Sequence, residues 1–230
     1  PPGREVRVRN IQVHGRDVER AEAGQRVALN LAGIEKWEIR RGSVVASPGY
    51  YRTTRLIDVS LTLLPSAPRP LKNLDPVHFF LGTARVVARL LLLEREELKP
   101  GEKSIVQCRL NQPLVADRGD PFIIRSYSPM TTIGGGRVLD PAPSRHRRFR
   151  RDSFAHLLEL EQEPAAGGDE AFIYRKLEQL LIADPARLAR EVRLEEKQVK
   201  EVLEGLLRKG AAVKLGESYL PQKVFQEWEG

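Results

Sequence analysis

The spacing of apolar residues changes once along this chain of 230 residues, and the change limits what it can fold into. Up to residue 143, apolar and polar residues alternate in short runs, which is the period of a β-strand with one buried face. The clearest run places Ile57, Val59, Leu61 and Leu63 on one face. From Asp169 onward, apolar residues recur every three or four positions, as in amphipathic helices. The sequence therefore predicts a β part followed by a helical part.

Turn residues divide the β part into short strands. The turns are expected at Pro48-Gly49, at Pro100-Gly101, and at residues 118–121 and 134–136. Short strands at this spacing are typical of small barrels or sandwiches. The apolar phase slips between Val8 and Ile11, which indicates a β-bulge. Residues 78–93 are largely apolar, interrupted by Gly82, Arg85 and Arg89, and we expect them to form one strand with a bend.

Three features of the β part have a structural interpretation beside a functional one. Cys108 shares the face of Val106 and Leu110, a position more typical of a core residue than of a nucleophile. His78 lies in an apolar strand, where we expect a satisfied core histidine. The glycines at 134–136 lack the Lys and Ser/Thr of a phosphate-binding loop, so they predict a close approach between strands.

The helical part has the signals of a winged helix. A short helix is expected at 152–163, and the Pro- and Gly-containing residues 164–168 predict a linker. After a first helix from Asp169, Asp184 followed by Pro185 predicts the cap and first turn of a second. A third helix is expected to end at Gly210 and to be followed by two short strands. Three helices and a hairpin in this order form a winged helix.

Charge and composition limit the classes of function. Residues 1–151 hold 27 Lys and Arg against 15 Asp and Glu, whereas residues 152–230 hold 11 against 16, so only the first part is basic. This contrast favours a polyanion as partner of the first part. One cysteine and four scattered histidines give no metal-ligand spacing, and no catalytic constellation is present. With neither an apolar span nor a secretory signal, we expect a cytoplasmic protein.

Several segments resemble the selenocysteine-specific translation elongation factors, a family of translational GTPases. Residues 11–15 (IQVHG), 23–34 (AGQRVALNLAGI) and 39–42 (IRRG) resemble the later half of the family's domain II. Residues 81–84 (LGTA), 119–125 (GDPFIIR) and 133–138 (IGGGRV) resemble its domain III. A winged helix after a third domain is similar to the bacterial members, whereas elongation factor Tu ends at that barrel.

The resemblance implies mainly β barrel-like domains of the elongation factor Tu domain II and III type, followed by an α+β winged-helix domain. We expect a partial domain II barrel at 1–50, a domain III β-barrel at 51–143, a basic joint with a short helix and linker at 144–168, and a winged helix at 169–230. The GTPase domain and the later winged helices are expected to be missing. GTP and magnesium would then bind outside this fragment, and we expect no enzyme activity of it.

The resemblance also implies sites for tRNA. Glu38 and Arg41 match the residues that hold the tRNA 3′ end, and His14, Arg40 and Arg41 are candidates for a selenocysteyl pocket. The expected tRNA-backbone contacts are Arg118, Arg125, Tyr127 and Arg137. For Arg125, an internal salt bridge is the alternative. The arginines of the basic joint could also contact RNA, namely Arg145, Arg147, Arg148, Arg150 and Arg151.

The expected function is that of a tRNA-binding and linker portion of such a factor, with selenocysteyl-tRNA and the ribosome as partners. A messenger-RNA hairpin would be bound by modules absent here. The alternatives are a winged-helix DNA-binding regulator and a fragment of another tRNA-delivering GTPase. Glu195 and Glu196 start the third helix of the winged helix, where a groove-reading helix needs donors or cations. We therefore expect the winged helix to act mainly as a spacer.

Overall fold

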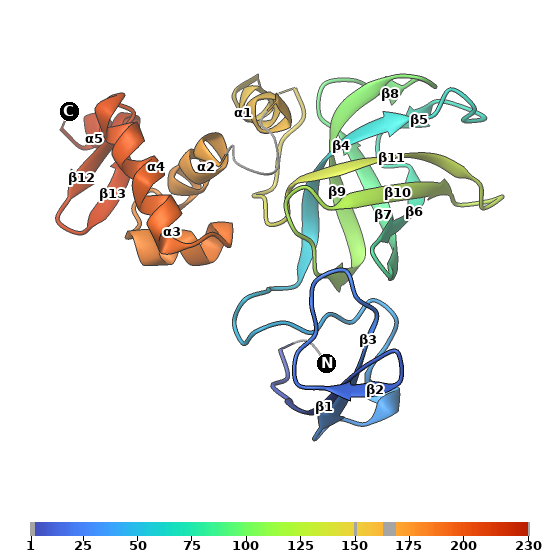
Figure 1. Ribbon diagram of the computed structural model, residues 1–230. Coiled ribbons are helices and arrows are strands. Elements are labelled where there is room, and N and C mark those ends of the chain that lie inside the picture. Colours follow the sequence, from blue (N-terminus) through green and yellow to red (C-terminus); the bar gives the residue numbers. More distant parts are fainter. Residues whose placement is uncertain (1–2, 150, 163–168, 230) are drawn as a thin grey trace. The chain divides into compact units, whose positions relative to one another are not determined.

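The computed structural model describes residues 3–149, 151–162 and 169–229 (Figure 1). The chain divides into two compact units, Pro1–Arg52 and Thr53–Gly230, each described by itself below. Within the described ranges, no helix has the length and apolar character needed to cross a membrane.

The first unit is a small antiparallel sheet. Strands β1 (Arg7–Val13), β2 (Arg16–Val18) and β3 (Val27–Ala32) pair in the order β2-β1-β3, and the 3-10 helix η1 (Lys36–Glu38) follows. The register between β1 and β3 shifts between Val8 and Asn10, which confirms the predicted bulge. None of the described residues between 3 and 52 is buried, so this sheet forms no core of its own.

The second unit begins with a closed six-stranded barrel, which confirms the predicted β-barrel. Its strands are β4 (Thr54–Leu63), β6 (Pro76–Leu81), β7 (Ala84–Leu92), β9 (Lys103–Leu114), β10 (Pro121–Ser126) and β11 (Thr132–Asp140). They follow one another in the order β10-β11-β4-β9-β7-β6, and the β10–β6 pair closes the ring. A separate ribbon consists of β5 (Leu71–Lys72) and β8 (Glu97–Leu98).

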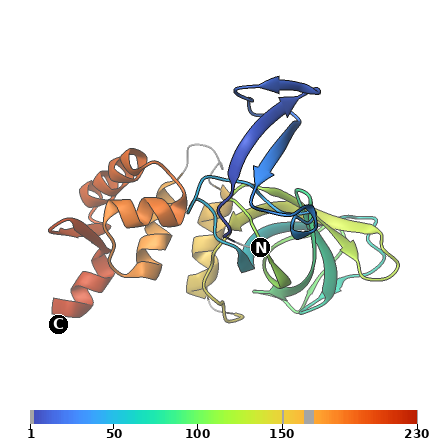
Figure 2. The ribbon, with the colours of Figure 1, turned by 90° about the horizontal axis from the view of Figure 1, so that it is seen from below.

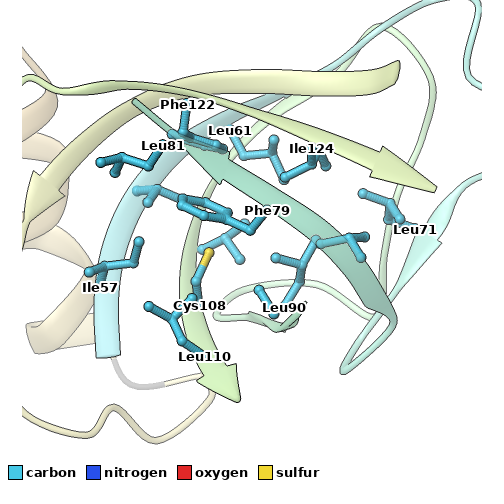
Figure 3. Close-up of a cluster of buried hydrophobic side chains, with 14 of the residues drawn as sticks. Ile57, Leu61, Leu71, Phe79, Leu81, Leu90, Cys108, Leu110, Phe122 and Ile124 are labelled. Atoms are coloured by element: carbon cyan, nitrogen blue, oxygen red, sulfur yellow. The ribbon is translucent and has the colours of Figure 1, made fainter. Parts of the chain in front are cut away.

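Alternate side chains of the barrel strands fill its interior. Ile57, Phe79 and Cys108 have no exposed surface, and they point into the same apolar cluster (Figure 3). The assignment of Cys108 to the core is therefore confirmed. Burial raises the pKa of its thiol far above the usual value, which suppresses the reactive thiolate.

The predicted bent strand at 78–93 is wrong, because the chain reverses there. Residues 76–81 form β6 and residues 84–92 form β7, and the two pair antiparallel with Leu81 opposite Ala84. Gly82 has φ of +52°, a left-handed conformation that glycine adopts at little cost and that two-residue hairpins require. The apolar residues on both sides of the turn hid the reversal from an analysis of periodicity.

The glycines of β11 lie where the predicted close approach occurs. A Cβ atom on Gly134 would lie 2.6 Å from the carbonyl oxygen of Thr62 in β4. One on Gly135 would lie 2.6 Å from the carbonyl oxygen of Phe122 in β10. One on Gly136 would overlap the carbonyl oxygen of Ser60. The three glycines therefore serve strand packing on both sides of β11. The turn expected at 134–136 is wrong, because these residues lie within the strand.

The second unit continues with a winged-helix fold, as predicted. Helices α1 (Arg151–Gln162), α2 (Glu170–Leu180), α3 (Pro185–Val192) and α4 (Glu196–Arg208) precede the hairpin of β12 (Ala212–Leu215) and β13 (Ser218–Pro221). A last helix, α5 (Gln222–Glu229), was not predicted. Asp184 caps α3 by accepting a hydrogen bond from the backbone N–H of Arg187. The predicted linker at 164–168 lies outside the described residues.

Helix α1 lies between the barrel and the other helices, as Figures 1 and 2 both show. It contacts β9 and β11 on one side and α2 on the other. A second apolar cluster joins these elements and is continuous from the outer wall of the barrel to the interior of the winged helix. Its members include Leu91, Ile105, Leu139, Leu157, Phe172, Ile173 and Leu203.

Candidate RNA-binding surfaces

The outer face of β6 and β10 brings an arginine, a histidine and a tyrosine together. His78 of β6 lies opposite Arg125 of β10 in the strand register. The ring of Tyr127, which follows β10, stacks on His78 with a centroid distance of 5.2 Å and an interplanar angle of 9°. Tyr127 remains 57% exposed, so its outer ring face is open to a ligand.

Two polar atoms of this group are buried without a hydrogen-bond partner among the described residues, the Nδ1 of His78 and the Nε of Arg125. A terminal nitrogen of Arg125 donates to the backbone carbonyl of Met130 at 2.7 Å, which fixes the guanidinium against the loop. His78 therefore differs from the satisfied core histidine that we predicted. Its neighbours Val77 and Phe79 point into the barrel, so the alternation along β6 could have placed His78 on the outer face.

Further cations lie on the same outer wall. Arg137 of β11 is exposed and lies opposite Pro121 of β10. Arg85 of β7 is exposed and lies over the ring of Phe80 in β6, with 5.8 Å between its Cζ and the ring centroid. We call this group the cationic face, and it consists of His78, Phe80, Arg85, Arg125, Tyr127 and Arg137. Cations beside aromatic rings suit contacts to phosphates, ribose hydroxyls and bases.

Arg118 does not belong to the cationic face. Its guanidinium pairs with Asp169 at 2.9 Å and lies over the ring of Phe172 at 5.1 Å. The side chain is only 9% exposed, so it is not available to a phosphate. We therefore remove Arg118 from the predicted tRNA contacts. Sequence alone could not reveal this, because Asp169 is 51 positions away.

In the first unit, the predicted 3′-end residues follow one another around η1. The Glu38 carboxylate pairs with Arg4 at 2.6 Å and accepts a hydrogen bond from the backbone N–H of Glu35. Arg40 and Arg41 follow η1 and are exposed. His14 is exposed in the turn between β1 and β2, at a φ of +52°. A hollow on this unit is lined by residues of β1, β3 and the η1 region, including Asn10, Gln12, Leu29, Asn30, Ile34, Lys36 and Ile39.

The arginines of the basic joint fall into two groups. Arg145 and Arg147 are exposed. The guanidinium of Arg148 is engaged within the protein, because it donates to the carbonyls of Leu92 and Arg95 and pairs with Glu96 at 3.0 Å. Arg150 and the side chain of Arg151 lie outside what the structure describes. Only Arg145 and Arg147 thus remain candidates for RNA contact that the structure can place.

The third helix of the winged helix, α4, presents acidic residues at its start. Glu195 and Glu196 are exposed, and Lys200 is paired with Glu196 at 2.6 Å. In the wing, Lys214 lies over the ring of Tyr219 at 5.6 Å. A groove-reading helix would need unpaired donors or cations at these positions.

Within the described ranges, no group of three or more His, Cys, Asp or Glu side chains could hold a metal ion.

Comparison with known proteins identifies the barrel. A family model described as the β-barrel domain of selenocysteine-specific elongation factors matches residues 58–145. Over these residues, the barrel is similar to this family. The selenocysteine-specific elongation factor of Desulfomicrobium baculatum is 40% identical over 173 residues, which cover 75% of this chain and 27% of that protein.

Two further relatives extend the comparison. The selenocysteine-specific elongation factor of Escherichia coli strain K12 is 27% identical over 226 residues, which are 97% of this chain and 33% of that protein. Elongation factor Tu 2 of Streptomyces avermitilis is 29% identical over 138 residues, which are 58% of this chain and 35% of that protein. The chain thus spans about a third or less of the length of the curated selenocysteine-specific relatives. It is similar to one portion of a selenocysteine-specific translation factor.

Proposed function

We propose that this chain is the tRNA-binding and spacing portion of a factor that delivers selenocysteyl-tRNA to the ribosome at recoded UGA codons. The cationic face of the barrel carries the proposal, because it combines exposed arginines with an open tyrosine ring on a barrel of this family. Arg125 and Arg137 would contact phosphates of the tRNA acceptor and T stems. His78 and Tyr127 would line the same path, where the exposed ring of Tyr127 could stack on a base.

The salt dependence of tRNA binding tests the cationic face. Each phosphate contact that is lost should lower the log–log salt slope by roughly one unit. We expect Arg137→Ala to weaken binding of all tRNAs alike and to reduce the slope by about that amount. The matched control is Arg187→Ala, which removes an exposed arginine from α3 and should leave the slope unchanged. If the slope is unchanged for Arg137→Ala, or is reduced for Arg187→Ala, the proposal that the barrel carries the tRNA-binding surface is contradicted.

The proposed 3′-end site needs a different control, because Glu38 also has a structural partner. Glu38→Ala would remove both a possible acceptor for a ribose hydroxyl and the ion pair with Arg4. Arg4→Ala breaks the same pair but leaves the carboxylate in place. We expect Glu38→Ala and Arg41→Ala to weaken binding of tRNA with an intact 3′ adenosine, and Arg4→Ala to have a small effect. If Glu38→Ala and Arg4→Ala reduce the affinity for tRNA equally, Glu38 has only a structural role, through its ion pair with Arg4.

The proposed selenocysteyl pocket is tested by discrimination rather than by affinity. An ionised selenol should gain more than a neutral hydroxyl from a cationic lining. Replacing His14 or Arg40 by Glu should therefore reduce the ratio of selenocysteyl-tRNA to seryl-tRNA affinity. A ratio that both substitutions leave unchanged would exclude these residues from the pocket.

The proposed role of the winged helix is to act as a spacer. The acidic start of α4 would repel a phosphate backbone, Lys200 of α4 is paired with Glu196, and Lys214 of the wing lies over the ring of Tyr219. We expect this chain to show no saturable, sequence-dependent binding of the messenger hairpin at physiological salt. Such binding, if lost on reversing the charge of Lys200, would replace the spacer role by direct readout.

A further inference from the structure

Three polar side chains are completely buried on the outer wall of the barrel. Asp58 of β4, Gln107 of β9 and Asp140 of β11 each have no exposed surface. Asp58 alternates with Ile57 and Val59, whose side chains fill the interior, so it points outward. A carboxylate on the outer face of a barrel is ordinarily hydrated, and burying one is costly unless it is paired. The buried carboxylates therefore require a cover that supplies partners.

The segment after β11 supplies the first partner. The Nε2 of His146 lies 2.5 Å from Oδ2 of Asp58. Gln107 supports both residues, since its amide donates to Oδ1 of Asp58 at 2.9 Å and its carbonyl oxygen accepts from the His146 backbone N–H at 3.3 Å. Burial raises the pKa of the Asp58 carboxyl, and the hydrogen bond from His146 opposes that rise.

Helix α2 of the winged helix supplies two basic side chains. The Nζ of Lys176 lies 2.9 Å and 3.0 Å from the two carboxylate oxygens of Asp140 and donates to the carbonyl of Ala142 at 2.7 Å. The guanidinium of Arg175 lies between the two acids, 3.6 Å from Asp58 and 3.8 Å from Asp140. Both cations are themselves buried. We call this group the ionic joint, and it consists of Asp58, Gln107, Asp140, His146, Arg175 and Lys176.

An apolar interface surrounds the ionic joint. Leu91, Ile105 and Leu139 of the outer barrel wall pack in one cluster with residues of α1 and α2. At the rim, Arg193 pairs with Asp117 at 3.3 Å, and Glu161 of α1 pairs with Lys103 at 2.9 Å. Modules of one chain ordinarily move relative to each other unless their interface is large and apolar. This interface has a shared apolar core, and two acids of one module meet two cations of the other inside it.

We propose that the barrel and the winged helix form one rigid body, with their mutual angle set by the ionic joint. Apolar surfaces can slide past each other at small cost, but an acid that leaves its cation while it stays buried loses its partner away from solvent. A charge pair therefore permits one docking angle and penalises the others. The proposal extends the spacer role and makes it a rigid one, although the coupling can be measured without any RNA.

A distance measurement between spin labels tests the rigidity. Labels on Gln112→Cys in β9 and Lys197→Cys in α4 occupy exposed positions, and the native Cys108 is buried, so we expect it to stay unlabelled. We expect one narrow distance distribution that does not change between low and high salt, because buried pairs are screened little. A broad distribution in the unaltered joint would refute the proposal.

Substitutions within the joint test its role in setting the angle. We expect Lys176→Met to add a second, broader population, because it leaves Asp140 buried without its closest cation. Since that variant could also unfold, the double variant Asp140→Leu/Lys176→Met removes both charges and keeps an apolar contact. It should fold and still show the broader distribution. The control is Lys200→Met, which breaks the exposed pair with Glu196 and should change nothing.

The outcomes separate this proposal from the proposed function. A narrow distribution that persists in the folded double variant would show that the angle does not depend on the Asp140–Lys176 pair, which would refute the role proposed for the ionic joint. A narrow distribution in the parent chain, broadened by the double variant, supports the joint even if the chain binds no tRNA. Conversely, tRNA binding with a broad parent distribution would support the proposed function and overturn rigid coupling.

Discussion

Replacing Gly136 by alanine should destabilise the barrel, although this substitution ordinarily stabilises a folded chain. Alanine restricts the unfolded chain more than glycine does, a gain of about 0.4–1 kcal/mol where the added Cβ fits. At Gly136 it does not fit, because the Cβ would overlap the carbonyl oxygen of Ser60 and lie 2.9 Å from its carbonyl carbon. Carbon atoms in contact are about 3.5–4.0 Å apart, so β11 and β4 must separate.

The expected size follows from these opposing effects. Overpacking typically costs about 1–3 kcal/mol, and a clash with paired backbone on a strand hydrogen-bonded on both sides belongs at the upper end. After the gain in the unfolded state is subtracted, a net loss of about 2 kcal/mol remains. For a chain of this size, that corresponds to a melting temperature lower by about 4–8 °C.

Urea unfolding followed by circular dichroism measures the loss, and Gly205→Ala is the matched control. Gly205 lies within α4, and an added Cβ there would meet nothing within 4 Å. Alanine in a helix interior should gain up to about 1 kcal/mol relative to glycine. Replacing glycine by alanine should therefore lower the free energy of unfolding at position 136 and raise it at position 205. A change of less than about 0.5 kcal/mol at Gly136, the ordinary range for surface positions, would refute the steric argument.

Three more predictions follow from single contacts. Cys108 should resist alkylation in the folded chain even at pH 9, because burial raises its thiol pKa, and should react on unfolding in denaturant; rapid labelling of the native chain would contradict its burial. Asp184→Ala should cost about 1 kcal/mol in urea unfolding through loss of the α3 cap, whereas Asp184→Asn should largely retain the stability. Phe79→Ala should cost about 3–5 kcal/mol, since the ring is fully buried inside the barrel, and a smaller loss would mean that the core collapses around it.

Local sequence signals predicted the elements whose structure depends on near neighbours. The alternation from Ile57 to Leu63 identified the inward face of β4, because one buried face imposes a period of two. Asp184 and Pro185 located the start of α3, since a cap and its first turn are adjacent in the chain. The β-bulge near Val8 was visible for the same reason, as a slip of the apolar phase within one strand.

Features that depend on distant partners were not predictable in this way. Asp58 occupies the polar phase of β4, where a side chain is ordinarily hydrated. It is buried because His146, 88 positions later, and helix α2 cover it. Arg118 was assigned to RNA for a related reason, because its pairing with Asp169 arises only when the winged helix docks. The cationic face was predicted in part, through Arg125, Tyr127 and Arg137, but His78 required the closure of the barrel between β6 and β10.

The interface between the barrel and the winged helix also increases the difference in charge between these two parts of the chain. Salt bridges join the barrel to helix α2 and to the elements that follow α2. On the barrel side they involve three acidic residues and one basic residue, namely Asp58, Asp117, Asp140 and Arg118. On the other side they occupy three bases and one acid, namely Arg175, Lys176, Arg193 and Asp169. When the residues of these salt bridges are left out of the count, the net charge of the barrel becomes more positive. The net charge of the winged helix becomes more negative. A polyanion approaching this unit should therefore be attracted to the barrel and repelled by the winged helix more strongly than a count of residues suggests.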